Sequence, residues 1–130
     1  MTPLHITTNK DLAQLLIAKG ANVNAKNNIG ETALHWAEDH EQKEIVELLI
    51  ANDSDVNAKD NIGGTPLHRA TDVCNKEIVE LLITDGAEIN AKNDDGDTPL
   101  DMADNKEILY LIRKHGGGTA EELKAEAISK

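Results

Sequence analysis

The sequence predicts an all-α solenoid of about four helix-turn-helix units, with projecting β-turns and a short C-terminal capping helix. Three observations support this prediction. A short phrase, Thr-Pro-Leu-His in its fullest form, starts at residues 2, 32, 65 and 98, so its copies are 30, 33 and 33 residues apart. Each copy is followed by an apolar helical segment, and the first three copies are then followed by a polar turn rich in Asn, Asp and Gly. A fixed period of this length is typical of repeat arrays, whose units bury their apolar faces against each other.

The phrase itself predicts the first helix of each unit. In the third copy Thr65 is suited to the N-cap position, because its hydroxyl can accept a hydrogen bond from a free backbone N–H. Pro66 fits the first turn, where its missing donor is not needed. The distance from this Thr to the Lys that opens the second helix is 11 residues in the middle units and 8 in the outer ones. We therefore expect the outer first helices, or their loops, to be about one turn shorter.

The second helices are predicted at 11–17, 44–50, 77–83 and 107–112, where apolar residues recur at i, i+1, i+3 and i+4. Gly20, Gly86 and Gly116 follow three of them, as a left-handed C-terminal cap prefers. Asp53 stands at this place in the second unit. Because Asp adopts the left-handed conformation at some cost, we expect this junction to be the weakest of the three.

Polar segments at 27–30, 60–63 and 93–96 end in Gly and predict tight projecting turns. After the last repeat, Gly116–Gly118 interrupt the pattern, and Thr119 with Glu122 forms a capping box. We expect a short helix over 119–127, folded back on the last repeat. The predicted organisation is an array over 1–116, with units at about 1–31, 32–64, 65–97 and 98–116, and a tail over 117–130.

The repeated Thr-Pro-Leu-His-x-Ala phrase, the Glu-Ile-Val-x-Leu-Leu helix and the Val-Asn-Ala-Lys turn resemble ankyrin repeats over residues 2 to about 116. The resemblance implies antiparallel helix pairs stacked side by side, with hairpin-like turns projecting to one side. It also implies a concave face, built from the turns and first helices, at which partners usually bind. The family has Gly-His between the helices of a unit, whereas the middle units here have Glu41-Gln42 and Cys74-Asn75.

The charge of the chain limits the class of partner. The net charge is −11, and residues 32–64 and 65–97 contribute −6 and −5, with eight acidic residues each against two and three basic ones. Such a surface repels phosphates and anionic lipids, so we expect no nucleic acid or membrane partner. It favours a protein with a basic surface, although solubility alone explains an acidic surface equally well. Cys74 is the single cysteine, which favours a reducing, cytoplasmic location.

The sequence contains no motif that favours catalysis: it has no Gly-rich phosphate loop, no Cys-x-x-Cys and no His-Glu-x-x-His. We expect no enzymatic activity, no cofactor and no metal. His5, His35 and His68 recur at one position of the repeat. Repeats stack about 10 Å apart, whereas zinc needs nitrogen ligands at about 2 Å, so two of these histidines cannot share an ion. The resemblance implies that each bonds the Thr of its own phrase and the turn backbone.

The position after the His, or after Asp101 in the last unit, carries Ile6, Trp36, Arg69 and Met102. The resemblance implies that this position is variable and partly reachable from the concave face. Trp and Arg are the types most enriched at binding hot spots, although Trp36 could equally fill space between first helices. The predicted protein-binding residues lie on the first helices (Trp36, Asp39, His40, Arg69, Asp72 and Val73) and at the turns (Ile29, Glu31, Ile62, Asp95 and Asp97).

Asn24, Asn57 and Asn90 occupy a setting that is hydroxylated in some animal ankyrin repeats, so the resemblance makes them candidate modification sites. Side-chain bonds that hold the turn are the favoured explanation. The function we predict is that of a monomer which binds another protein through a rigid, preorganised surface. The alternatives are a scaffold or regulatory segment of a larger multidomain protein, an appendage of an enzyme, and a designed binder, against which the irregular spacing argues.

Overall fold

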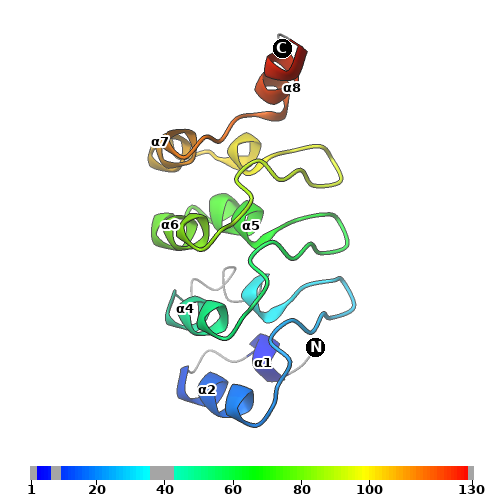
Figure 1. Cartoon of the computed structure of the whole chain (residues 1–130), viewed down its shortest axis with the longest axis vertical. Helices are drawn as coiled ribbons and strands as arrows, with labels where there is room; N and C mark the ends of the chain where they lie inside the picture. The colour runs from blue at the N-terminus through cyan, green and yellow to red at the C-terminus, as the bar shows by residue number, and fades with distance from the viewer. Residues whose placement is uncertain (1–2, 7–9, 36–42, 129–130) are drawn as a thin grey trace.

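The computed structural model describes residues 3–6, 10–35 and 43–128, and arranges them as a row of stacked helix pairs (Figure 1). One column of the row contains the second helices, α2 (Lys10–Ala18), α4 (Lys43–Ala51), α6 (Lys76–Thr84) and α7 (Lys106–Lys114). The other contains α1 (Pro3–Ile6), α5 (Pro66–Asp72) and the 3-10 helix η1 (Pro99–Met102). Helix α8 (Ala120–Ile128) lies at the C-terminal end of the row. The described ranges contain no strand, and the predicted all-α solenoid is confirmed.

The first helices begin as the sequence predicts. Thr65 is the N-cap of α5, where its hydroxyl accepts a hydrogen bond from the backbone N–H of His68 at 3.3 Å. Thr98 caps η1 in the same way. The 3-10 helix η1 spans four residues, against seven in α5, so the predicted shortening is confirmed for the last unit; for the first unit it stays a prediction, because residues 7–9 lie outside the described ranges.

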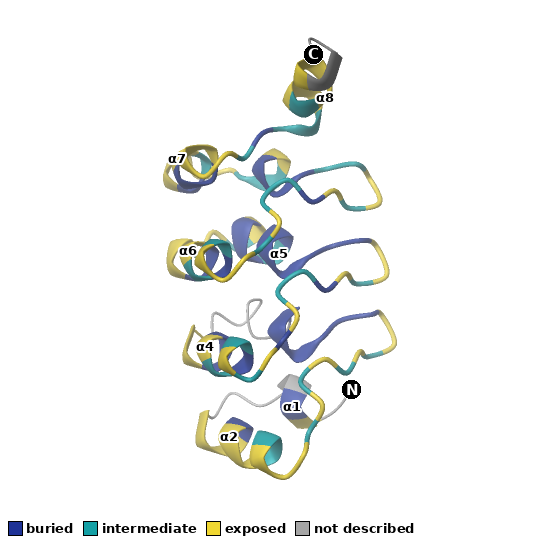
Figure 2. Cartoon of the chain, viewed as in Figure 1, coloured by how far each residue is buried: buried dark blue, intermediate teal, exposed yellow. Residues whose placement is uncertain are grey.

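The core runs along the row between the two columns. The second helices α4, α6 and α7 contribute large apolar side chains that are at most 3% exposed, among them one pair from each helix. These pairs are Ile45 and Leu49, Ile78 and Leu82, and Ile108 and Ile112. The first helices add Leu34, Leu67 and Leu100, at most 2% exposed. Figure 2 shows buried residues on the sides of the helices that face other elements, and exposed residues along the outer side of the second-helix column. Each such side chain contributes about 1.5–3 kcal/mol by leaving water, so the units stabilise each other.

Left-handed backbone ends the second helices. Gly20, Gly86 and Gly116 have φ of 94°, 96° and 92°, and Asp53 has φ of 67° at the same place in the second unit. The conformation predicted for Asp53 is therefore confirmed, while the weakness of its junction stays a prediction. Cys74 also has a positive φ, 59°, between α5 and α6. A side chain in this region costs roughly 1 kcal/mol relative to Gly.

The turns form a ladder along one side of the row. The side-chain oxygen Oδ1 of Asp60 accepts from the backbone N–H groups of Ile62 and Gly64, at 3.0 and 2.8 Å, and closes its turn. The next turn is joined to it, because Asp94 N donates to Ile62 O at 2.9 Å. Two features require Gly at position 63. Its φ of 75° lies in the left-handed region, and a Cβ there would lie 2.9 Å from Asp94 N, which is too close. These bonds fix the turns relative to one another.

The tail helix α8 is attached to the last repeat. Its predicted capping box is present, since Thr119 Oγ1 accepts from Glu122 N at 3.1 Å. Arg113 donates both terminal nitrogens to the Glu122 carboxylate at 2.9 Å, and these bonds lower the pKa of Glu122 to about 2. Asp101 Oδ2 accepts from Ala120 N at 2.9 Å. Arg113 therefore anchors the tail to the last repeat.

Candidate protein-interaction groove

A groove of about 330 Å³ lies between the turns and the first helices, in the centre of the array. Its turn side is formed by Asp60, Ile62, Gly64 and Asn93, and its helix side by His68, Arg69 and Asp72 of α5 and Met102 of η1. We call it the turn–helix groove. It joins two consecutive turns to two consecutive first helices, so its shape depends on how the units are held together.

Two buried histidines hold the helix side to the turns. His68 Nδ1 lies 3.2 Å from Thr65 N in its own unit, and Nε2 lies 2.8 Å from the carbonyl oxygen of Asp97 in the next turn. His35 makes the same contacts with Thr32 and, at 2.9 Å, with Gly64 O. Because a carbonyl can only accept, Nε2 carries the proton and Nδ1 accepts. The contacts with the Thr and the turn backbone are as the family resemblance implies.

The histidines are suited to this structural role, because both ring nitrogens of His35 and of His68 already have partners. Burial lowers the pKa of His35 and so favours the neutral ring. The bond to the Gly64 carbonyl acts in the opposite direction but is the smaller effect. In the last unit Asp101 replaces the His, and its carboxylate accepts from Thr98 N at 2.9 Å. Burial would raise the pKa of Asp101, but the bonds from Thr98 and Ala120 outweigh it and lower the pKa. Within the described ranges, no three His, Cys, Asp or Glu side chains are grouped so that they could hold a metal ion.

The recurring asparagines also join consecutive units. Asn57 Nδ2 donates to Gly86 O at 3.2 Å, and its Oδ1 accepts from Glu88 N at 2.7 Å. Asn24 bonds the next unit in the same way, and Asn90 bonds Gly116 O and Gly118 N ahead of α8. Both ends of each amide are therefore used, which supports the structural explanation. Modification of these residues stays a prediction.

Arg69 is held in place by two carboxylates. Its guanidinium forms ion pairs with Glu31 and, at 2.9 Å, with Asp60. The Arg69 side chain is 20% exposed and both carboxylate side chains are 5% exposed. Burial would raise the pKa of Asp60, but the bonds from Arg69, Gly64 and Ile62 outweigh it and lower the pKa. Arg69 is thus a fixed wall of the groove.

One predicted turn residue is placed differently from expectation. Glu31 was expected among the projecting tips, yet it is 4% exposed, so that expectation of an accessible side chain is wrong. The reason is local: Asn27 Nδ2 donates to Glu31 Oε1 at 2.8 Å, and Arg69 pairs with its other oxygen. Glu31 therefore does not line the groove, but it holds Arg69, which does.

The other predicted binding residues divide into three groups. Arg69, Asp72 and Ile62 line the groove together, and Ile62 is 67% exposed. Ile29 is 56% exposed and Asp95 is exposed, while Val73 and Asp97 are half-buried; these four do not line the groove. Trp36, Asp39 and His40 lie outside the described residues.

Sequence reasoning did not place Asp60 and Asn93 in the groove, and named Met102 only as a variable position. One signal was available for Asp60. The equivalent residues Asn27 and Asn93 make the same turn bonds with an amide, so the turn does not require a charge. Asp60 is the only carboxylate among these three equivalent residues, and Arg69 is the single arginine in the repeat that follows it. This combination indicates a specific ion pair between Asp60 and Arg69.

The fold and the groove together define a class: helical repeat proteins that present a preorganised surface made by several units. The family model for ankyrin repeats, described as three copies, matches residues 1–60 and again 42–120. The chain belongs to the ankyrin-repeat family, whose members are generally protein–protein interaction modules and typically non-enzymatic. The comparison with curated proteins gives no match. In the described part of the chain, no helix has the length and apolar character needed to cross a membrane.

Proposed function

We propose that this chain binds another protein through the turn–helix groove, as a rigid surface without chemistry. The main support for the proposal is that some side chains of the groove are held in place by bonds within the chain, whereas others are exposed and available for contact. The histidines, Asp60 and Arg69 are bonded to one another or to the backbone, whereas Ile62 and Asp72 line the same groove and are exposed. A surface that is already ordered loses little conformational entropy when a partner binds.

The chemistry of the groove favours a partner segment with basic and apolar residues. Asp72, Asp94 and Asp95 are exposed at the groove or on the adjacent turn. Ile62 and Met102 provide apolar contact area within it. With a net charge of −11, the chain attracts a basic partner over a distance and repels nucleic acids and anionic lipids. We propose that the chain acts as a monomer inside the cell and that raising the salt concentration slows association.

The test is a selection from a random peptide display library, with the full chain as bait. We expect peptides that combine Lys or Arg with an apolar residue to be enriched. The double variant Ile62→Ser/Asp72→Asn should lose this enrichment while its circular dichroism stays that of the wild type, because both side chains are exposed. Glu47→Gln, an exposed change on the outer side of α4, is the matched control and should keep it. Equal enrichment by the double variant would refute the proposal.

A further inference from the structure

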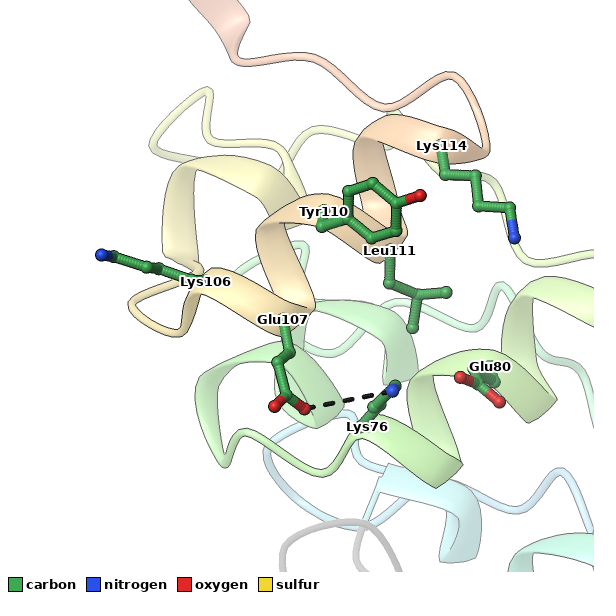
Figure 3. Close-up of a pocket in the computed structure, with 7 residues that line it drawn as sticks. All are labelled: Lys76, Glu80, Lys106, Glu107, Tyr110, Leu111 and Lys114. Atoms are coloured by element: carbon green, nitrogen blue, oxygen red, sulfur yellow. Dashed lines mark ion pairs between the residues drawn. The ribbon is translucent and has the colours of Figure 1, made fainter.

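A second cavity, of about 340 Å³, lies on the other column of the row, between α6 and α7. Figure 3 shows Leu111 pointing from α7 toward α6, with the ring of Tyr110 beside it. The rim consists of Lys76 and Glu80 from α6 and of Lys106, Glu107 and Lys114 from α7. We call this the outer groove. It shares no lining residue with the turn–helix groove.

Tyr110 breaks the pattern of the second helices. Its place in the repeat is held by Gln14, Glu47 and Glu80 in the other units, all exposed polar residues. Tyr110 is 70% exposed, so the core does not need its ring. An exposed aromatic side chain beside a cavity offers a large apolar contact area at low entropic cost, and Tyr is enriched at interfaces for this reason.

The charge of the outer groove also differs from that of its neighbour. Its rim carries three lysines and two glutamates, a balance of +1. The equivalent places between α4 and α6 carry Lys43 and Lys76 against Glu47, Glu77 and Glu80, a balance of −1. Part of the change comes from Lys114, whose place is held by Ala18, Ala51 and Thr84 in the other units.

The lysines are available to a ligand. Lys76 and Glu107 are 4.0 Å apart, with side chains 51% and 74% exposed, which is a weak pair in water. Lys106 and Lys114 are exposed at opposite ends of α7, about 12 Å apart along the helix axis. In Figure 3 their side chains extend in different directions, on either side of Tyr110.

We propose that the outer groove binds an acidic peptide segment of a second partner, which places an apolar or aromatic side chain against Tyr110 and Leu111. Acidic residues on both sides of that side chain pair with Lys106 and Lys114. The charge complementarity is the reverse of that at the turn–helix groove, so the chain can join a basic partner to an acidic one.

The test begins with the same random peptide display library, with the wild-type chain as bait, and then compares the wild type with two variants. The wild type should enrich peptides that contain Asp or Glu on both sides of an apolar or aromatic residue. Tyr110→Glu restores the residue type found at Glu47 and Glu80, and adds a repelling charge at a 70% exposed site without disturbing the core. It should lower the affinity of a fluorescein-labelled peptide from the enriched class at least tenfold, measured by fluorescence polarisation. The matched control is Lys43→Ala, which removes an equivalent lysine on α4 and should change the affinity less than twofold.

Three results would overturn the proposal. The first is a wild-type selection without acidic, aromatic-containing peptides. The second is equal binding of the peptide to Tyr110→Glu and to the wild type. The third is a dimer in size-exclusion chromatography with light scattering that Tyr110→Glu dissociates, which would identify a second copy of this chain as the occupant. Because Ile62→Ser/Asp72→Asn leaves the outer groove intact, it should retain the acidic peptides even if the proposal for the turn–helix groove fails.

Discussion

The substitution Arg69→Met tests the electrostatic support of the turn–helix groove. Met is chosen because Met102 holds the equivalent place in the next unit. The change removes the cation that pairs with Glu31 and Asp60, whose carboxylate side chains are 5% exposed. The negative charges of two buried carboxylates are then left without a compensating positive charge. The Met side chain replaces most of the apolar part of the Arg69 side chain, so the packing changes little.

The expected cost follows from the burial of the ion pairs. Removing one partner of a buried pair costs about 3–5 kcal/mol, because the remaining charge is left without compensation. Arg69 is 20% exposed, so water screens part of this effect, and we expect about 3 kcal/mol, the lower end of the range. Domains are typically stable by roughly 5–15 kcal/mol, so this is a large fraction.

The assay is urea unfolding followed by circular dichroism at 222 nm. A second variant separates charge from packing: Arg69→Met/Asp60→Asn should recover about 1–2 kcal/mol, because an amide keeps the turn bonds, as it does at Asn27 and Asn93, and loses the charge. Asp60 has a lowered pKa in the wild type, so its contribution is present above about pH 4 and is lost as the pH falls further. The gap between wild type and Arg69→Met should therefore narrow in acid. A cost below about 1 kcal/mol at pH 7, or no recovery in the double variant, would refute the reasoning.

Three further predictions follow from the described contacts. Asp53→Gly should stabilise the chain by about 1 kcal/mol in urea unfolding, because φ is 67° there; a loss of stability would contradict this. Asn57→Ala should cost about 0.5–1.5 kcal/mol in the same assay, since it removes an exposed hydrogen bond to the Glu88 N–H; an unchanged midpoint would show that water replaces the bond. The pKa of His35 is lowered by burial, so the folded state binds fewer protons than the unfolded state, and the contribution of this residue is complete above about pH 6.5 and lost as the pH falls through the folded pKa. An NMR titration in which the His35 ring protonates at or above pH 6.5 would contradict that sign.

Much of the fold could be predicted because its causes are local. The period of the Thr-Pro-Leu-His phrase gave the number and spacing of the helix pairs, and the side chain of Thr65 determines where α5 begins. The left-handed cap at Asp53 follows from the glycines at equivalent places. The capping box of α8 needs only residues three positions apart. Each of these features depends on neighbours within one turn of helix.

The groove could be predicted only in outline, because it depends on contacts between units. That Arg69 is fixed by Glu31 and Asp60 requires the distance between two turns and a helix, which no periodicity supplies. The burial of Glu31 follows from the same geometry. The positive φ of Cys74 was also not anticipated, although the family resemblance places a Gly at this site. The outer groove also depends on contacts between units; its signal in the sequence is Tyr110, where the equivalent places carry Gln14, Glu47 and Glu80.

If a basic partner segment binds at the turn–helix groove, NMR chemical-shift mapping will show it at single residues. The ¹⁵N-labelled chain is titrated with a basic peptide from the wild-type selection. We expect the backbone amide signals of Ile62, Asp72 and Met102 to shift together and to saturate with one affinity. Shifts confined to α6 and α7, or spread without saturation over the acidic surface, would contradict it.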